Sequence, residues 1–288
     1  MDSTPLESFS RDGLRFILDD AGPRDGAVAL LLHGFPTDRT SWHAVAPLLH
    51  DAGLRTLAPD QRGYAEGARP AGVAAYRLEE LVADAVTLLD TAGVGRAHVV
   101  GHDWGGAVAW LLAAHHPDRV ASLTVLSTPH PAALSRAWKS DGDQRRRSWY
   151  VAAFQVPWVP ERVFAARFAP LLVRTGMPAA DARRYAARLA RPGALRGPIS
   201  WYRATRGSRL GAHRVTVPTT LVWGSRDTFL GRRAAELTAE HVTGDYDFVE
   251  LDDNHWLPER RAAECAAAIL ARVGDVGDTG SGKKPARG

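Results

Sequence analysis

The stretch Val99-Val100-Gly101-His102-Asp103-Trp104-Gly105-Gly106 decides how the rest of the chain is organised. Apolar, β-favouring residues from Ala97 to Val100 run into a Gly-x-Asp-x-Gly turn, and residues 107–114 then have a helical composition. Glycines flank the central residue because such a turn brings backbones close together and strains the residue between them. The stretch therefore predicts a strand, a sharp turn and a helix, with the Asp103 side chain exposed above a sheet.

The residue type at the centre of this turn sets the chemistry that the turn can support. Asp103 stands where a Gly-x-Ser-x-Gly esterase has serine, which argues against a serine esterase. A carboxylate is ionised at neutral pH, needs no base to activate it, and can form an ester with a substrate. Aspartate is also a favoured helix N-cap, so the turn alone leaves a capping role and a nucleophilic role open.

Length and composition exclude several classes of protein. The 288 residues suffice for one large α/β domain with an insertion or for two small domains. The net charge is only +4 and arginines are spread along the chain, so no nucleic-acid partner is expected. The cluster Arg145-Arg146-Arg147 is interpreted as a solvated helix face rather than a phosphate clamp.

Cysteine content and hydropathy bear on the compartment. Cys265 is the single cysteine, which excludes an internal disulfide, and its alanine-rich surroundings predict a small buried residue. The N-terminus is polar and acidic, and no apolar run approaches the roughly 20 residues of a membrane span. We therefore expect a cytoplasmic protein with no membrane partner.

Strands and helices alternate along the first part of the chain. Segments 14–18, 27–32, 54–58, 97–100 and 120–126 are predicted strands, and segments 41–49, 76–89 and 107–114 between them have helical spacing. This alternation predicts a mostly parallel sheet with helices on both faces.

The alternation breaks between residues 130 and 214, where proline-punctuated, aromatic-rich helical segments predict a helical cap. Strands resume at 218–223 and 246–251, followed by helices at 232–240 and 258–273. The expected organisation is thus a core from residues 1–129 and 215–273, a cap at 130–214, and a disordered tail at 274–288.

Three side chains follow predicted strands in the order Asp103, Asp227, His255. Functional groups of open α/β sheets gather at the C-terminal ends of the strands, so these three are expected to meet. Nucleophile, acid and histidine in this order is the chain order of an α/β-hydrolase.

The chain resembles a soluble-type epoxide hydrolase of the α/β-hydrolase fold from about Pro5 to Val273. The motifs that carry the resemblance are His33-Gly34-Phe35-Pro36, Gly101 to Gly106, Trp223-Gly224-x-x-Asp227, Asn254-His255-Trp256, Tyr150-x-x-x-Phe154-Gln155 and Trp201-Tyr202-Arg203. The resemblance implies a mostly parallel twisted sheet flanked by helices, with a helical cap inserted after the sixth strand. After Gln155 the family often has Pro-Gly, whereas this chain has Val156-Pro157.

The resemblance also implies roles for individual residues. Asp103 would attack an oxirane carbon to form an ester, while the cap residues Tyr150 and Tyr202 hold the epoxide oxygen. His255, oriented by Asp227, would then activate the water that hydrolyses the ester.

The oxyanion of that second step would be held by the backbone N–H groups of Phe35 and Trp104. Phe35, Trp104, Tyr150 and Tyr202 would also contact the substrate. His33 and His102 are interpreted as positioning or packing residues rather than catalysts. The Phe35-Pro36 bond is a candidate cis peptide.

The partners implied are an apolar epoxide, which becomes a vicinal diol, and water. The sequence shows no ligand cluster or phosphate-binding loop, so no cofactor and no metal are expected. It offers no support for a homodimer.

Three alternatives to an epoxide hydrolase can be weighed against the sequence. A haloalkane dehalogenase would use the same aspartate and Trp104, but Phe35 stands where a His-Gly-Asn-Pro variant has its halide-binding asparagine. A fluoroacetate-type dehalogenase would need arginines beside the nucleophile, and Trp104-Gly105 offers none. A ligand-binding protein on the hydrolase fold would need none of the three residues that serve as nucleophile, acid and base, so the presence of all three argues against it.

Overall fold

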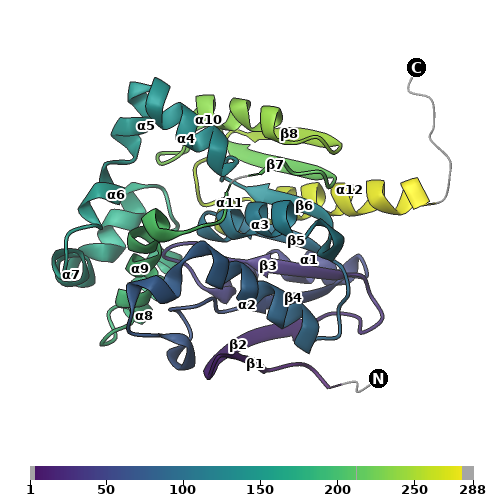
Figure 1. Ribbon diagram of the computed structural model, residues 1–288, viewed down its shortest axis with the longest axis horizontal. Helices are drawn as coiled ribbons and strands as arrows, with labels where there is room; N and C mark the ends of the chain where they lie inside the picture. The colour runs from purple at the N-terminus through teal and green to yellow at the C-terminus, as the bar shows by residue number, and fades with distance from the viewer. Residues whose placement is uncertain (1–3, 212, 281–288) are drawn as a thin grey trace.

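An eight-stranded sheet with the order β1-β2-β4-β3-β5-β6-β7-β8 forms the centre of the protein (Figure 1). The computed structural model describes residues 4–211 and 213–280. The strands are β1 Ser8–Arg11, β2 Leu14–Ala21, β3 Val28–Leu32, β4 Arg55–Pro59, β5 Ala97–His102, β6 Val120–Leu126, β7 Thr219–Gly224 and β8 Tyr246–Leu251. Strands β3 to β8 pair in parallel, and β1 and β2 are antiparallel to their neighbours, which confirms the predicted mostly parallel sheet.

Helices cover both faces of the sheet. They are α1 Ala46–Asp51, α2 Leu78–Thr91, α3 Trp104–His115, α10 Arg232–Leu237, α11 Leu257–Arg260 and α12 Ala262–Gly280. In β3, Leu30 and Leu32 belong to the core on the α2–α3 side, whereas Ala29 and Leu31 belong to the core on the α1–α12 side. Because successive side chains of a strand point to opposite faces, a strand covered on both sides is apolar throughout.

Six α-helices lie between β6 and β7 in the part of the chain that the structure describes. They are α4 Pro131–Ser140, α5 Gly142–Arg147, α6 Trp149–Ala153, α7 Val159–Arg174, α8 Ala179–Leu189 and α9 Arg196–Ala204. Figure 1 shows α6 to α9 gathered at one end of the sheet, on the left of the view. Helix α4 instead packs its Ala133 and Ala137 against Ala234 and Leu237 of α10. The division of the chain into a core and a cap stays a prediction.

Polar contacts attach α8 and α9 to the loops after β3 and β4. The Arg188 guanidinium of α8 pairs with the buried carboxylates of Asp38 and Asp60. The Trp201 indole of α9 donates a hydrogen bond to the Arg62 carbonyl at 2.8 Å. These helices are therefore held by defined contacts and not by apolar packing alone.

A proline explains where one predicted helix is divided. Pro47 lies in the first turn of α1, so segment 41–49 is a 3₁₀ turn at Arg39–Trp42 followed by α1. Pro258 lies in the first turn of α11, where the helix predicted at 258–273 also begins, and that helix is divided at Arg261, between α11 and α12. Proline lacks a backbone N–H and fits the first helical turn, where that group has no partner, so each proline begins a new helix.

The C-terminal helix corrects the predicted start of the tail. Helix α12 continues to Gly280, where the sequence had placed disorder from Gly274 onward. Arg272 and Asp275, three residues apart and thus on one helical face, pair across this boundary. Residues 281–288 lie outside the described part of the chain. Strand β1 was not predicted, because its four residues are too few for an alternating pattern to emerge.

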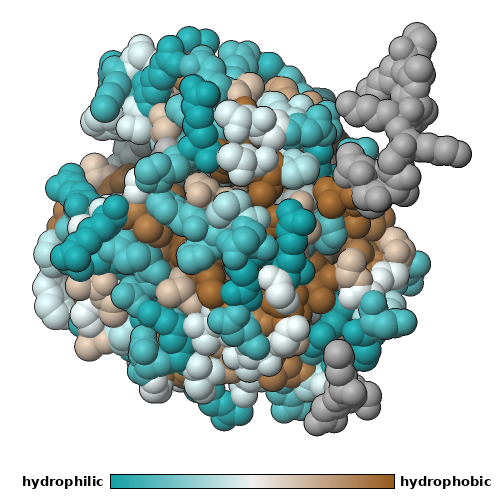
Figure 2. Space-filling view, turned by 45° about the vertical axis from the view of Figure 1, so that its right-hand side comes forward, coloured by the Kyte–Doolittle hydropathy of each residue, from teal (hydrophilic) through white to brown (hydrophobic). Residues whose placement is uncertain are grey.

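The distribution of polar and apolar side chains fits the expectations from the amino-acid composition. On the face shown in Figure 2, hydrophilic side chains predominate and hydrophobic atoms show in patches between them. Cys265 is fully buried, as predicted. None of the described helices is long and apolar enough to cross a membrane.

Candidate active site

The turn between β5 and α3 holds Asp103 in a strained conformation. Its φ of 52° and ψ of −121° are rare for any residue other than glycine. A Cβ at Gly101 would lie 2.4 Å from the Gly105 carbonyl oxygen, so a side chain there would push the strand and helix apart. The predicted strand, turn and helix are confirmed, and Asp103 is aimed away from the sheet.

Asp103, His255 and Asp227 come together at the C-terminal ends of β5, β8 and β7. The His255 Nε2 lies 3.4 Å from Asp103 Oδ2, and its Nδ1 lies 2.7 Å from Asp227 Oδ2. Since a carboxylate only accepts, Nδ1 carries a proton and donates it to Asp227. The other Asp227 oxygen accepts backbone N–H groups from Phe229 at 2.7 Å and Leu230 at 3.0 Å. These two hydrogen bonds hold the Asp227 carboxylate in the position from which it accepts the hydrogen bond of His255.

The backbone of His255 is held as firmly as its ring. Its carbonyl oxygen accepts hydrogen bonds from His102 Nε2 at 2.9 Å and from the Ser127 hydroxyl at 2.9 Å. Burial and the neighbouring His255 lower the pKa of His102 to about 4, so His102 is a neutral donor. Its position fits the predicted positioning role.

Charges in the site favour an ion pair at rest. Burial raises the pKa of Asp103, but the hydrogen bond and charge of His255 outweigh it, and the pKa lies below its usual value. Burial likewise lowers the pKa of His255, but Asp227 and Asp103 more than offset this and raise it to about 10. Asp103 is thus a carboxylate that faces an imidazolium.

The loop after β3 brings a backbone donor to Asp103. The Phe35 N–H donates to Asp103 Oδ1 at 2.7 Å. A Cβ at Gly34 would lie 2.3 Å from the Asp103 Cβ, so only glycine allows this approach. His33 Nδ1 donates to the Gly34 carbonyl at 3.0 Å, and the Phe35-Pro36 bond is cis, as predicted.

Trp104 begins α3 directly after Asp103. Backbone N–H groups in the first turn of a helix have no acceptor within the helix, so the Trp104 N–H is free of helical bonding. The indole ring packs edge-on against Tyr202, with 4.8 Å between ring centroids. Its side chain therefore supports Tyr202 from the sheet side.

Tyr150 of α6 and Tyr202 of α9 face the same space, with ring centroids 6.0 Å apart. Burial, then the Asp103 charge, raises the pKa of Tyr150; burial, then Tyr150 and Asp103, raises that of Tyr202. Both phenols therefore keep their protons at neutral pH and can donate hydrogen bonds.

A cavity of about 710 Å³ joins these groups. Its walls include Asp103, His255, Tyr150, Tyr202 and Phe35, whereas Asp227 and Trp104 are not among the lining residues. Other lining residues are Pro36, Arg146, Arg147, Trp149, Phe154, Phe168, Leu171, Leu172, Arg174, Thr175, Thr228, Phe229 and Trp256. The structure thus gives the predicted nucleophile, histidine and tyrosines one shared, mainly apolar space.

Several of these wall residues were not predicted. Phe168 and Leu172 lie four residues apart on one face of α7, and Thr175 caps the end of that helix three residues later, so this spacing was a usable signal. No pattern in the sequence indicated which face of α7 would meet Asp103. Arg145 and Arg146 are exposed, as expected for a solvated face, but Arg146 and Arg147 also line the cavity.

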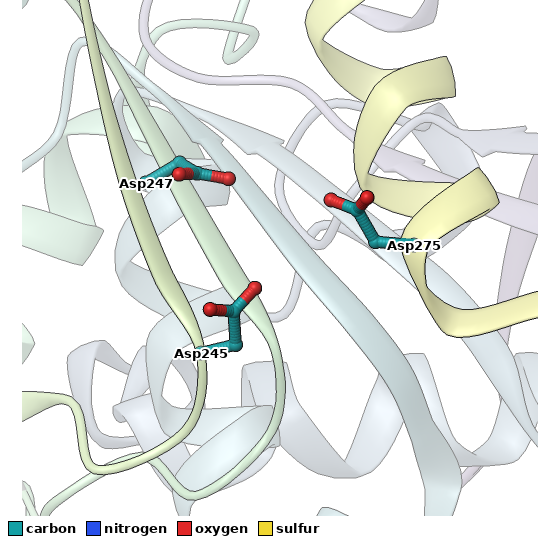
Figure 3. Close-up of side chains that lie close together, drawn as sticks. All are labelled: Asp245, Asp247 and Asp275. Carbon is teal, nitrogen blue, oxygen red and sulfur yellow. The ribbon is translucent and has the colours of Figure 1, made fainter. Parts of the chain in front are cut away.

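One group of carboxylates among the described residues is close enough to hold a metal ion. Asp245, Asp247 and Asp275 converge in Figure 3 from the start of β8 and from α12. The fully buried Arg272 guanidinium donates to Asp245 at 2.7 Å and to Asp247, and lies 3.8 Å from Asp275. The Arg272 guanidinium already pairs with all three carboxylates, so the cluster carries no metal assignment.

Comparisons with known proteins extend over nearly the whole chain. Residues 28–262 match the family model of the alpha/beta hydrolase fold. The chain is 35% identical to the AB hydrolase superfamily protein YfhM of Bacillus subtilis, covering 94% of this chain and 98% of that protein. It is 32% identical to epoxide hydrolase A of Mycobacterium tuberculosis, covering 90% and 94% of the two chains. The solved structure of epoxide hydrolase A from Mycobacterium thermoresistibile is 29% identical, with a TM-score of 0.79 over 94% of this chain and 98% of that one.

Proposed function

This chain belongs to the α/β-hydrolase fold family, in its epoxide hydrolase branch, and we propose that it hydrolyses an apolar epoxide to a vicinal diol. The observation that carries this proposal is one cavity lined by a carboxylate, a histidine and two protonated tyrosines. A carboxylate can open a strained ring, and phenols can protonate the oxygen that leaves.

In the first step, Asp103 Oδ2 attacks an oxirane carbon. A C–O bond of the ring breaks, an ester forms on Asp103, and the alkoxide takes a proton from Tyr150 or Tyr202. The raised pKa values of both tyrosines support this role, because the donors are fully protonated before the ring opens. Phe35 already donates to Oδ1, which leaves Oδ2 as the attacking atom.

In the second step, His255 activates the water that hydrolyses the ester. Ester formation removes the Asp103 charge, one of the two that raise the pKa of His255, so the imidazolium gives up its proton more readily, and this proton restores the tyrosine that protonated the alkoxide. Neutral His255 then takes a proton from a water molecule while that water attacks the ester carbonyl. Asp227 stabilises the imidazolium that forms again.

The oxyanion of this second step develops on Oδ1. The Phe35 N–H, 2.7 Å from Oδ1, is placed to stabilise it, and we assign the second donor to the Trp104 N–H. Loss of one such donor typically costs about 2.7–4 kcal/mol in other enzymes.

The helices between β6 and β7 act as a cap in this proposal, because they carry both tyrosines over the nucleophile. The segment 130–214 would then separate the cavity from bulk water, although α4 packs on α10. Water exclusion strengthens the contacts of the tyrosines with the developing alkoxide.

The dehalogenase alternative has less support. It needs the Trp104 indole to face the leaving halide, whereas that ring packs on Tyr202 and is not among the residues that line the cavity. It also leaves the paired tyrosines without a role.

Incubation of the purified chain with styrene oxide and, separately, with 1-bromobutane tests the proposal. We expect phenylethanediol to form from styrene oxide. The release of bromide from 1-bromobutane should not exceed that of an Asp103→Ala control. Bromide release without diol formation would instead establish the dehalogenase.

A further inference from the structure

The loop between β7 and α10 carries both the acid of the site and part of the cavity wall. Asp227 accepts the hydrogen bond of His255, and the Phe229 ring packs edge-on against the His255 ring, with 5.0 Å between the ring centroids. The centroid of the Phe229 ring also lies 5.4 Å from that of Tyr150, and Phe229 lines the cavity. The position of this loop therefore affects where the His255 ring is held.

Gln144 of helix α5 binds this loop through its side-chain amide. The amide N–H donates to the Phe229 carbonyl oxygen at 3.0 Å, and the amide oxygen accepts the Gly231 N–H at 2.8 Å. Gln144 is only 1% exposed, and its amide nitrogen also donates to the Ser148 hydroxyl at 3.0 Å. A buried side chain thus joins two segments that are far apart in the chain.

The two contacts with the loop call for an amide. The Phe229 carbonyl needs a donor and the Gly231 N–H needs an acceptor, and an amide presents both side by side. A leucine of similar size would leave both backbone groups without these partners, and a glutamate would set an oxygen against the Phe229 carbonyl. Shape alone therefore cannot replace Gln144.

A second residue on the same face of α5 contacts the loop. Gln144 and Arg147 lie three residues apart, and the Arg147 guanidinium donates to the Asp227 carbonyl oxygen. Arg145 instead donates to backbone carbonyls at the end of α4. Figure 1 shows α5 next to α4 and α10, away from α7 and α8. Helix α5 therefore supports the loop of the acid, whereas α6 and α9 carry the tyrosines.

We propose that Gln144 is a positioning residue for ester hydrolysis, which keeps Asp227 and the Phe229 ring in contact with His255. This inference rests on the proposed function and adds to it a residue that does not line the cavity. Attack by Asp103 needs no base, whereas hydrolysis needs His255 in the correct tautomer and position. A displaced loop should therefore slow the second step and not the first.

Single-turnover kinetics with styrene oxide separate the two steps in Gln144→Leu. A misplacement of about 1 Å can cost about 100-fold, so we expect hydrolysis of the ester to slow by about 10- to 100-fold. Formation of the ester should change little, since Tyr150 keeps its ring contact with Tyr202. Gln144→Glu keeps the acceptor for Gly231, resembles the native side chain more closely, and should slow the same step if the leucine variant does not fold.

The matched control is Gln155→Leu, which removes another amide of the inserted helices. The Gln155 amide donates to the Tyr202 carbonyl oxygen and does not contact the loop of the acid. Hydrolysis of the ester should therefore keep its wild-type rate in this variant.

The pH dependence of ester hydrolysis separates positioning from a loss of folded protein. Titratable groups that interact with the His255 ring include Asp103, Asp227, His102 and Glu259. Burial lowers the pKa of His255 and Asp227 raises it, so a weaker contact with Asp227 should lower this pKa. Hydrolysis needs neutral His255, and its half-maximal rate should be reached at a lower pH in Gln144→Leu. A smaller amount of folded protein would lower the rate without moving this midpoint.

Proton NMR without substrate keeps this inference apart from the proposed function. The His255 Nδ1–H, which donates to Asp227 at 2.7 Å, should give a downfield resonance that is absent from His255→Gln. This resonance should move upfield or exchange faster with water in both Gln144 variants, and it should stay in place in Gln155→Leu.

Two outcomes would overturn the positioning role of Gln144. One is an unchanged resonance with an unmoved pH midpoint, and the other is equal slowing of both steps with an unmoved midpoint. In either case the proposed function stands if the wild type forms and hydrolyses the ester. If the wild type forms no ester, the proposed function fails, and the resonance alone decides whether Gln144 positions His255.

Discussion

The two sides of the cavity are built in different ways. On the sheet side, each reacting group is fixed by backbone: Asp103 by a strained turn, Asp227 by two N–H groups, and His255 by two donors to its carbonyl. On the helical side, Tyr150 and Tyr202 are held mainly by ring contacts. The difference indicates that the chemistry is set by the sheet, whereas the helices can change shape and specificity around it.

The helical side has fewer polar supports, and they run between helices. The Gln155 amide donates to the Tyr202 carbonyl at 3.0 Å, which joins the end of α6 to α9. Arg203 donates to the Phe154 carbonyl at 2.9 Å and pairs with Glu161. Substitutions on this side should therefore cost less than those on the sheet side.

The largest effect is expected for Asp103→Gly. Loss of the nucleophile should reduce the rate of diol formation by at least about 10⁴-fold, as for other covalent catalysts. Relief of the positive φ should also make this variant more stable than Asp103→Ala, by about 1 kcal/mol or more. Urea unfolding of the two variants isolates the strain, because neither carries a carboxylate. Equal stability would mean that the turn stores no strain.

Asp227→Asn should give the next largest effect. The same change in a serine protease costs about 10⁴-fold in kcat, because the histidine adopts the wrong tautomer. Here the ester should accumulate, since only its hydrolysis needs His255 as a base. Single-turnover kinetics with mass detection would show whether alkylation outpaces release; equal slowing of both steps would contradict this assignment.

The Asp227 variant should also change how stability depends on pH. The pKa of His255 is raised to about 10: burial lowers it, but Asp227 and Asp103 outweigh burial. The native state therefore binds this proton more tightly than the unfolded state does. That stabilisation is complete below about pH 6.5 and is lost as pH rises to about 10. The decline in unfolding free energy over this window should be shallower in Asp227→Asn, and an identical decline would contradict the coupling.

A smaller loss is expected for the helical side in Tyr150→Phe/Tyr202→Phe. General-acid catalysis contributes about 10²–10⁴-fold, so the rate of ester formation should fall by this amount. Each single variant should lose less, because the remaining phenol still donates to the oxygen. Stopped-flow tryptophan fluorescence would follow the alkylation. Loss of ester hydrolysis alone would show that the tyrosines act elsewhere.

The smallest effect is expected for Gln155→Leu. It removes one hydrogen bond between α6 and α9, which contributes about 0.5–1.5 kcal/mol. KM should rise by less than about tenfold while the alkylation rate changes little, since Tyr202 keeps its ring contacts. A loss as large as that of the double tyrosine variant would show that the helical side is as rigid as the sheet side.

The sequence predicts the sheet side of the cavity better than the helical side. Asp103 and the strands around it were found because glycines, apolar runs and turns are local signals that each parallel strand repeats. Arg174 and Phe168 were not found, because helix packing decides which face of α7 meets the cavity, and no local pattern encodes that choice. Pro47 signals a helix start, but the predicted helix 41–49 places it in the interior.

The covalent ester on Asp103 is the central claim, and one trapping measurement tests it most directly. In His255→Gln the nucleophile remains while the base is lost, so styrene oxide should add its full mass to the peptide that contains Asp103. A styrene oxide adduct on that peptide, absent from His255→Gln/Asp103→Ala, is the predicted result. An unmodified Asp103 peptide, or one that only 1-bromobutane modifies, would contradict the account.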